Sequence, residues 1–137
     1  MSGTISTEQA LIYTMVTMSG VEGRINRTEL AEIGQLVQHL PIFRHFDETR
    51  LTAVAQECGE ILQETEGLKA VLGLIKEALS PKLRETAYAL AVEVAASDLV
   101  VGKEELRFLA ILRDTFGLDK LVTAAIERSA IARYQTE

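Results

Sequence analysis

The residues of this chain that could do chemistry are two pairs of carboxylates, each pair separated by seven positions. The first pair is Glu22 and Glu29, in the stretch GVEGRINRTEL, and the second is Asp98 and Glu105, in AASDLVVGKEEL. Hard divalent cations such as calcium prefer carboxylate and carbonyl oxygens as ligands. If the two stretches pack against each other, the four carboxylates are expected to form one shared, weak cation site.

A second interpretation of the same acids is structural. Glu29 and Glu105 are expected in the first turn of a helix, where the helix dipole favours a negative charge. Glu22 and Asp98 precede these helices, and each could accept hydrogen bonds from the free N–H groups of the first turn. The second stretch is not an EF-hand, because the positions that supply side-chain oxygens in that loop, counted from Asp98, hold valine and glycine.

The two stretches belong to longer segments that align with each other without a gap. Residues 18–37 align with residues 94–113 at an offset of 76, the separation of the two glutamates. The paired positions are Glu22 with Asp98, Ile25 with Val101, Asn26 with Gly102, and Glu29 with Glu105. The alignment predicts two helical hairpins, at about 10–40 and 86–116, related by an internal pseudo-repeat.

The elements that must position these acids are helices. Apolar residues recur with helical spacing in about seven segments. Their expected bounds are Ser6 or Thr7 to about Ser19, Arg27 to His39, a third helix after Asp47, a fourth from about Leu68, a fifth from Pro81 to about Ser97, a sixth from Gly102 or Lys103 to before Gly117, and a last from about Asp119. Proline and glycine mark several of these ends, since Pro81 suits a first helical position and Gly117 a left-handed C-cap.

Length and composition fit one all-α domain over residues 1–137, a single compact bundle with a frayed tail at about 132–137. The 137 residues are 47% hydrophobic, with only two prolines, and the net charge is −6. An acidic chain lacks the basic residues that displace counterions from phosphates, so we expect no nucleic-acid partner. No apolar run is long enough to cross a membrane, so we also expect no transmembrane segment.

The single cysteine and the two histidines argue against an intrachain disulfide and against a histidine-based metal site. Cys58 is the only cysteine, which fits a reducing compartment, and the polar start of the chain does not resemble a signal peptide. We therefore expect a cytoplasmic protein in which Cys58 is a buried small side chain. His39 and His45 lie near Asp47, but no third ligand has suitable spacing, so both are expected in a solvated connector.

The paired acidic loops resemble those of the TerB-like family, small all-helical proteins of the tellurite-resistance type. The family unit occurs twice in one domain and contains an alanine, an acid, a glycine, a β-branched residue and a second acid. The matching residues are Glu22, Gly23, Ile25 and Glu29 in the first copy, and Ala96, Asp98, Val101 and Glu105 in the second. The resemblance covers about residues 10–118. The chain departs from the family pattern at Glu22, where Asp is favoured, and at Leu99, where Gly is favoured.

The resemblance implies a non-enzymatic module of tellurite resistance or stress response. Such a module would bind a protein partner, with a calcium-like divalent cation at Glu22, Glu29, Asp98 and Glu105. The sequence does not identify the partner, and it leaves a homodimer open. Two alternatives also stay open: a plain helical scaffold whose acids only cap helices, and an enzyme or small-ligand carrier with a pocket among the helices. The last is disfavoured because no nucleophile, base and oxyanion donor occur together.

Overall fold

The computed structural model describes residues 4–20, 25, 27–97 and 101–137, and every regular element in these residues is helical. The α-helices are α1 (Thr7–Gly20), α2 (Arg27–His39), α3 (Leu51–Leu62), α4 (Gly67–Ala78), α5 (Pro81–Ser97), α6 (Lys103–Phe116) and α7 (Lys120–Arg133). Two 3₁₀ turns, η1 (Pro41–Phe43) and η2 (Glu48–Arg50), connect α2 to α3. The predicted compact bundle of seven α-helices is therefore confirmed. None of the described helices combines the length and the apolar character that a bilayer span needs.

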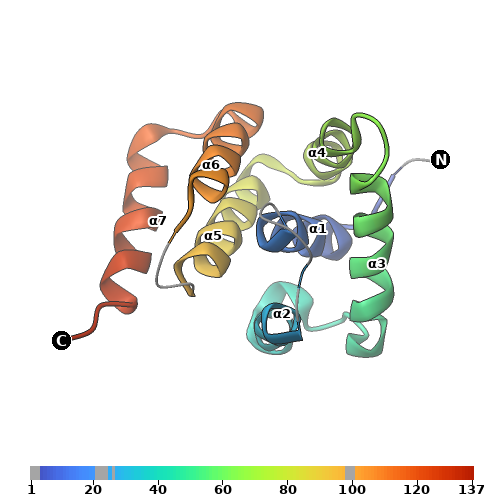
Figure 1. Cartoon of the computed structure of the whole chain (residues 1–137), viewed down its shortest axis with the longest axis horizontal. Coiled ribbons are helices and arrows are strands. Elements are labelled where there is room, and N and C mark those ends of the chain that lie inside the picture. The colour runs from blue at the N-terminus through green and yellow to red at the C-terminus, as the bar shows by residue number, and fades with distance from the viewer. Residues whose placement is uncertain (1–3, 21–24, 26, 98–100) are drawn as a thin grey trace.

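Helix α1 is the centre of the bundle (Figure 1). It contacts α5 and α3 on opposite sides, and also α4 and α2. Ten consecutive residues, from Ala10 to Ser19, are buried, so this helix has no solvent-exposed stripe. Within it, Thr14 Oγ1 donates to the carbonyl oxygen of Ala10 (2.9 Å) and Thr17 Oγ1 to that of Tyr13 (2.8 Å). These bonds let two hydroxyls lie in the core without an unsatisfied polar atom.

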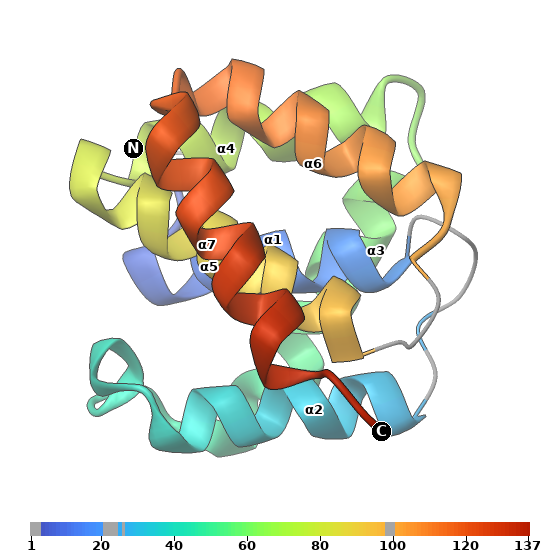
Figure 2. The ribbon, with the colours of Figure 1, turned by 90° about the vertical axis from the view of Figure 1, so that its left-hand side faces the viewer.

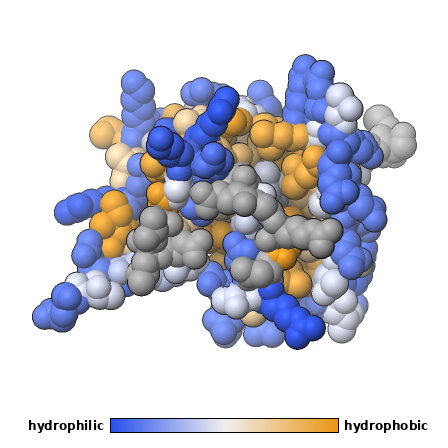
Figure 3. All heavy atoms as spheres, in the orientation of Figure 1, coloured by the Kyte–Doolittle hydropathy of each residue, from blue (hydrophilic) through white to orange (hydrophobic). Residues whose placement is uncertain are grey.

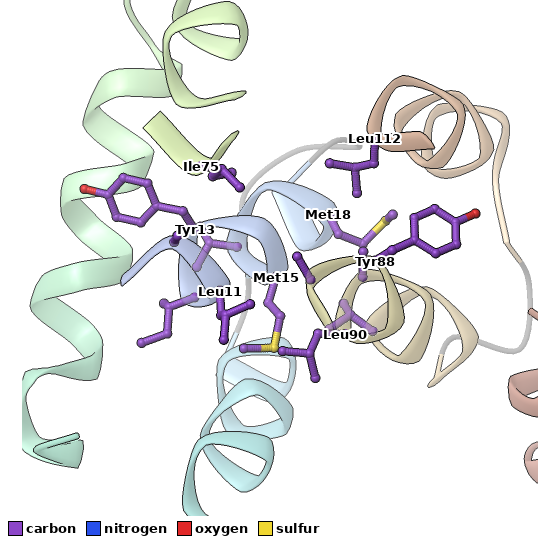
Figure 4. Close-up of a cluster of buried hydrophobic side chains, with 14 of the residues drawn as sticks. Leu11, Tyr13, Met15, Met18, Ile75, Tyr88, Leu90 and Leu112 are labelled. Carbon is purple, nitrogen blue, oxygen red and sulfur yellow. The ribbon is translucent and has the colours of Figure 1, made fainter. Parts of the chain in front are cut away.

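The helices around α1 are apolar on the side that faces it. Their buried residues include Ile33 and Val37 of α2, Val54 and Cys58 of α3, and Val71 and Ile75 of α4. Helix α6 contacts α5 and α4 and buries Phe108, Leu109, Leu112 and Phe116. The outer edge formed by α3 is hydrophilic (Figure 3). Cys58 is fully buried, as predicted, and burial raises the pKa of its thiol to about 11. Figure 4 shows Met18 of α1, Tyr88 of α5 and Leu112 of α6 within one cluster of buried hydrophobic side chains.

The residues that begin and end the helices match the turn signals of the sequence in most places. Pro81 is the first residue of α5, and Gly117 ends α6 with a φ of 62°. Asp119 caps α7, since its carboxylate accepts a hydrogen bond from the backbone N–H two residues further on (2.7 Å). Asp47 caps η2 rather than α3, so the third α-helix begins only at Leu51. A 3₁₀ turn therefore replaces the first turn of the predicted third helix.

Helix α7 crosses α5 at the edge of the bundle (Figure 2). Only Thr123 and Ala130 of α7 are buried, so apolar packing contributes little to its attachment. A cluster of polar side chains near the middle of α7 provides further attachment to the bundle. The Tyr88 hydroxyl donates to the Glu127 carboxylate, and Arg113 Nη1 donates to both the Tyr88 hydroxyl (2.8 Å) and Glu127 (3.1 Å). This cluster joins α5, α6 and α7.

A second polar cluster holds the end of α7. Arg133 and Tyr134 both donate to the Glu93 carboxylate of α5, the tyrosine at 2.5 Å. The sequence predicts fraying from about residue 132, but α7 continues to Arg133 and the chain is attached through Tyr134. Two hydrogen bonds to one partly buried carboxylate stabilise these residues, an arrangement that the apolar pattern does not reveal.

We expect the Tyr88 cluster to make the fold sensitive to alkali. Burial, together with the hydrogen bond to Glu127, raises the pKa of Tyr88 from 10.0 to about 12. Between pH 10 and 12 the folded state therefore holds a proton that the unfolded state loses, so stability falls as the pH rises. Urea unfolding at a series of pH values should show a shallower loss for Tyr88→Phe than for the wild type. Equal slopes would contradict this assignment.

Candidate functional site

A small polar cavity lies where the end of α1 and the start of α2 meet the end of α5 and the start of α6. Its volume is about 120 Å³. The residues that line it, here called the acidic cavity, are Ser19, Thr28, Glu29, Glu32, Val94, Ser97 and Glu105. Three of the seven are carboxylates and three are hydroxyls. This composition suits a ligand that carries positive charge and can donate hydrogen bonds.

Two of the four acids predicted from the sequence line this cavity. Glu29 and Glu105 come from different hairpins and are 76 positions apart, yet both lie on its wall. Glu22 and Asp98 lie outside the described residues, so the structure places neither of them. The packing of α1 with α5 supports this arrangement, because Ser19 near the end of α1 and Ser97 at the end of α5 line the same cavity.

Glu105 shows that the capping interpretation applies to at least one of the acids. Its side chain is 5% exposed, and Oε1 accepts a hydrogen bond from the backbone N–H of Gly102 (2.8 Å). Gly102 is the N-cap of α6 and Glu105 is the third residue of the helix, the usual position for this contact. One carboxylate oxygen therefore stabilises the helix start while the residue also lines the cavity.

Sequence reasoning missed a pair of residues in the cavity wall. The Ser97 hydroxyl, at the end of α5, donates to the Glu32 carboxylate of α2 and lies 2.8 Å from the carbonyl oxygen of Val94. This contact joins the two hairpins directly. Glu32 follows Glu29 by three positions, which places both carboxylates on the same face of α2. That spacing was the signal by which the sequence could have identified Glu32.

Ser19 contributes a buried hydroxyl to the same cavity. The residue is 8% exposed, and its Oγ finds no hydrogen-bond partner among the residues that the structure describes. Leaving a buried hydroxyl unsatisfied costs about 1–3 kcal/mol. A ligand in the cavity that offers or accepts a hydrogen bond would relieve this cost.

The carboxylates of the cavity do not by themselves form a metal-binding cluster. Over residues 4–20, 25, 27–97 and 101–137, no group of three or more His, Cys, Asp or Glu side chains could hold a metal ion. His39 and His45 are exposed, as predicted, but only His45 lies in the connector, because His39 is the last residue of α2. His39 Nδ1 lies 2.7 Å from the carbonyl oxygen of Gln35 on its own helix. The ligand atoms of a directly bound ion would have to include water or residues outside the described set.

A second, larger hollow lies between α2, α5 and α7. Its volume is about 420 Å³ and most of its surface is apolar. The lining residues are Leu36, Leu40, Ala89, Leu90, Glu93, Ala125, Ile126, Ser129 and Arg133. Glu93 and Arg133 pair with each other, so the charged groups here already hold α7 in place. Of the two hollows, the acidic cavity has the more polar lining.

A known family matches nearly the whole of this helical bundle. The matching family model is described as tellurite resistance protein TerB, and it covers residues 8–128. The match includes every residue that lines the acidic cavity. Neither the comparison with curated proteins nor that with solved structures gives a match. The chain therefore belongs to the TerB family of tellurite resistance proteins.

Proposed function

We propose that this protein is a non-enzymatic module that binds a protein partner and carries a weak divalent-cation site at its two acidic loops. Membership of the TerB family implies a role linked to tellurite resistance or stress. The family is generally not enzymatic, which supports a binding role. The net charge of −6 disfavours nucleic acid as the partner. The single cysteine supports a reducing, cytoplasmic location.

The observation that carries the cation proposal is the position of Glu29 and Glu105 on one cavity wall. Carboxylates brought together in this way repel each other, and a divalent cation between them relieves that repulsion. The unsatisfied hydroxyl of Ser19 and the other carboxylate and hydroxyl oxygens of the cavity are suitable ligands for a hard divalent cation. We propose Glu22 and Asp98 as further ligands, on the basis of their seven-residue spacing from Glu29 and Glu105.

We also propose that the two acidic hairpins are copies of one unit. The gap-free alignment of residues 18–37 with 94–113 supports this, as does the similar placement of Glu29 and Glu105 near the starts of α2 and α6. A duplicated hairpin explains how two loops distant in the sequence supply equivalent acids to one site. A homodimer is the simplest protein partner to test, by the mass of the protein in solution.

Melting curves in EDTA, calcium, magnesium and a matched monovalent salt test the cation proposal. With a dissociation constant of about 0.1 mM, about 10 mM of the cation stabilises the fold by roughly 2.7 kcal/mol. For a domain of this size the melting temperature should rise by on the order of 5–10 °C. The double variant Glu22→Gln, Asp98→Asn should abolish the rise.

A control variant separates this site from general charge effects. Glu64→Gln removes one exposed carboxylate outside the acidic cavity and should leave the rise unchanged. If no divalent cation raises the melting temperature beyond the monovalent salt, the acids only cap helices. The protein is then a plain helical scaffold.

A further inference from the structure

We propose that the acidic cavity takes its cation with a water shell largely in place, and that Ser19, Glu32 and Ser97 form the wall that contacts this shell. The inference rests on the proposed function, because it concerns the state of the ion in the same cavity. It adds three residues that the sequence pattern does not include. It also changes the expected ion from a calcium-like one to a magnesium-like one.

The size of the cavity is the first argument. A cavity needs at least about 10–15 Å³ of space open to a water-sized sphere to hold one water, so about 120 Å³ has room for a cluster of several waters. A bare divalent ion is smaller than one water molecule and would leave most of this space empty. An ion that enters therefore brings water with it. Magnesium loses its water reluctantly and commonly binds proteins through one or two carboxylates while keeping several waters.

The chemistry of the wall is the second argument. Water bound to a cation directs its hydrogens outward, so a wall that holds a hydrated ion must offer acceptors. Glu32 offers them, since a carboxylate has about four acceptor positions and the bond from Ser97 uses one. Ser97 fixes this carboxylate against α5, so its free positions are held in place rather than turned into solvent. Glu32 is thus oriented before any ligand arrives.

The third argument is the hydroxyl of Ser19. It is more than nine-tenths buried, it lines the cavity, and it finds no partner among the described residues. A single hydroxyl can both accept a hydrogen bond from a bound water and donate one to a second water. A hydrated ion would therefore satisfy an atom that the protein itself leaves unsatisfied.

The test uses hexaamminecobalt(III), whose ligands do not exchange and which mimics fully hydrated magnesium. We expect it to raise the melting temperature of the full chain and to compete with magnesium for one site. Glu32→Gln should weaken the binding of both ions by about tenfold or more, the loss expected for one charge-assisted hydrogen bond. Glu104→Gln, an exposed acid at the start of α6 outside the cavity wall, should weaken neither.

Failure of this inference can be told apart from failure of the proposed function. If magnesium or calcium binds but the cobalt complex does not compete, the ion is held directly and only the water-shell inference is wrong. If none of the three ions binds, both are wrong. If the cobalt complex binds equally to wild type and Glu32→Gln, it binds elsewhere and the wall is wrongly assigned.

A second variant gives a readout that a purely structural residue would not produce. Removing an unsatisfied hydroxyl should leave Ser19→Ala at least as stable as the wild type in EDTA. The same variant should show a smaller rise in melting temperature with magnesium. If Ser19→Ala melts lower in EDTA and keeps the full magnesium-dependent rise, the hydroxyl serves the fold and not the ion.

Discussion

Replacing Leu112 by alanine is expected to lower the free energy of unfolding by about 3 kcal/mol. Leu112 is fully buried in α6, which contacts α5 and α4, and Figure 4 draws it in the same buried cluster as Met18 and Tyr88. Alanine would leave a cavity on the buried side of α6, and close-packed neighbours relax into such a cavity only in part. Urea unfolding curves give the change from the shift in midpoint. A domain of this size has little stability to lose, so the variant should be marginal at physiological temperature.

Leu121 provides the matched control for Leu112. It is the same residue type, but in α7 its side chain is 81% exposed. Leu121→Ala removes almost no packing and should change the free energy of unfolding by no more than about 0.5 kcal/mol. If the two variants lose similar stability, α6 is not packed against α5 and α4 as described. The position of Glu105 in the acidic cavity would then also be wrong.

Replacing Gly67 by alanine is expected to cost about 3 kcal/mol, at the upper end of the range for overpacked sites. Gly67 is the first residue of α4, directly after Glu66, whose φ of 57° turns the chain out of α3. A Cβ at Gly67 would lie 2.2 Å from the carbonyl oxygen of Ile61 and 2.7 Å from that of Leu62. Both contacts are with backbone, so the end of α3 or the start of α4 must move.

Gly73 tests whether this cost is specific to the turn. It lies in the middle of α4, and a Cβ there would meet nothing within 4 Å. Gly73→Ala should therefore stabilise the fold by about 0.5–1 kcal/mol, because alanine is the better helix former. Opposite signs for two glycine-to-alanine changes in one helix are the expected result. Two variants of equal stability would mean that α3 and α4 do not approach closely at Gly67.

The sequence predicts the helices well because their signals are local. The apolar spacing in α2 and α6, Pro81 at the start of α5 and Gly117 at the end of α6 each act within one or two turns. Asp47 was assigned to the wrong kind of turn, since a capping carboxylate satisfies the first N–H groups of a 3₁₀ turn as readily as those of an α-helix. Cap residues thus locate a helix start only to within a few positions.

The candidate site is less predictable because it depends on packing between distant segments. Glu29 and Glu105 were found because a repeated spacing marks them in the sequence. Glu32 and Ser97 carry no such mark, and their contact exists only once α2 lies against the end of α5. The unsatisfied hydroxyl of Ser19 is likewise a property of the packed bundle, since an isolated helix end would leave it in water.

The complete burial of α1 has a consequence for the protein while it is being synthesised. Tyr88 of α5 follows Met18 of α1 by 70 residues. At a synthesis rate of roughly 5–20 residues per second, α5, which covers much of the surface of α1, is made about 4–14 s after α1. During that time the nascent chain exposes ten consecutive residues that the finished protein buries. Chaperones that bind apolar segments of growing chains are therefore expected to bind α1, and to be released once α5 has emerged and packed against it.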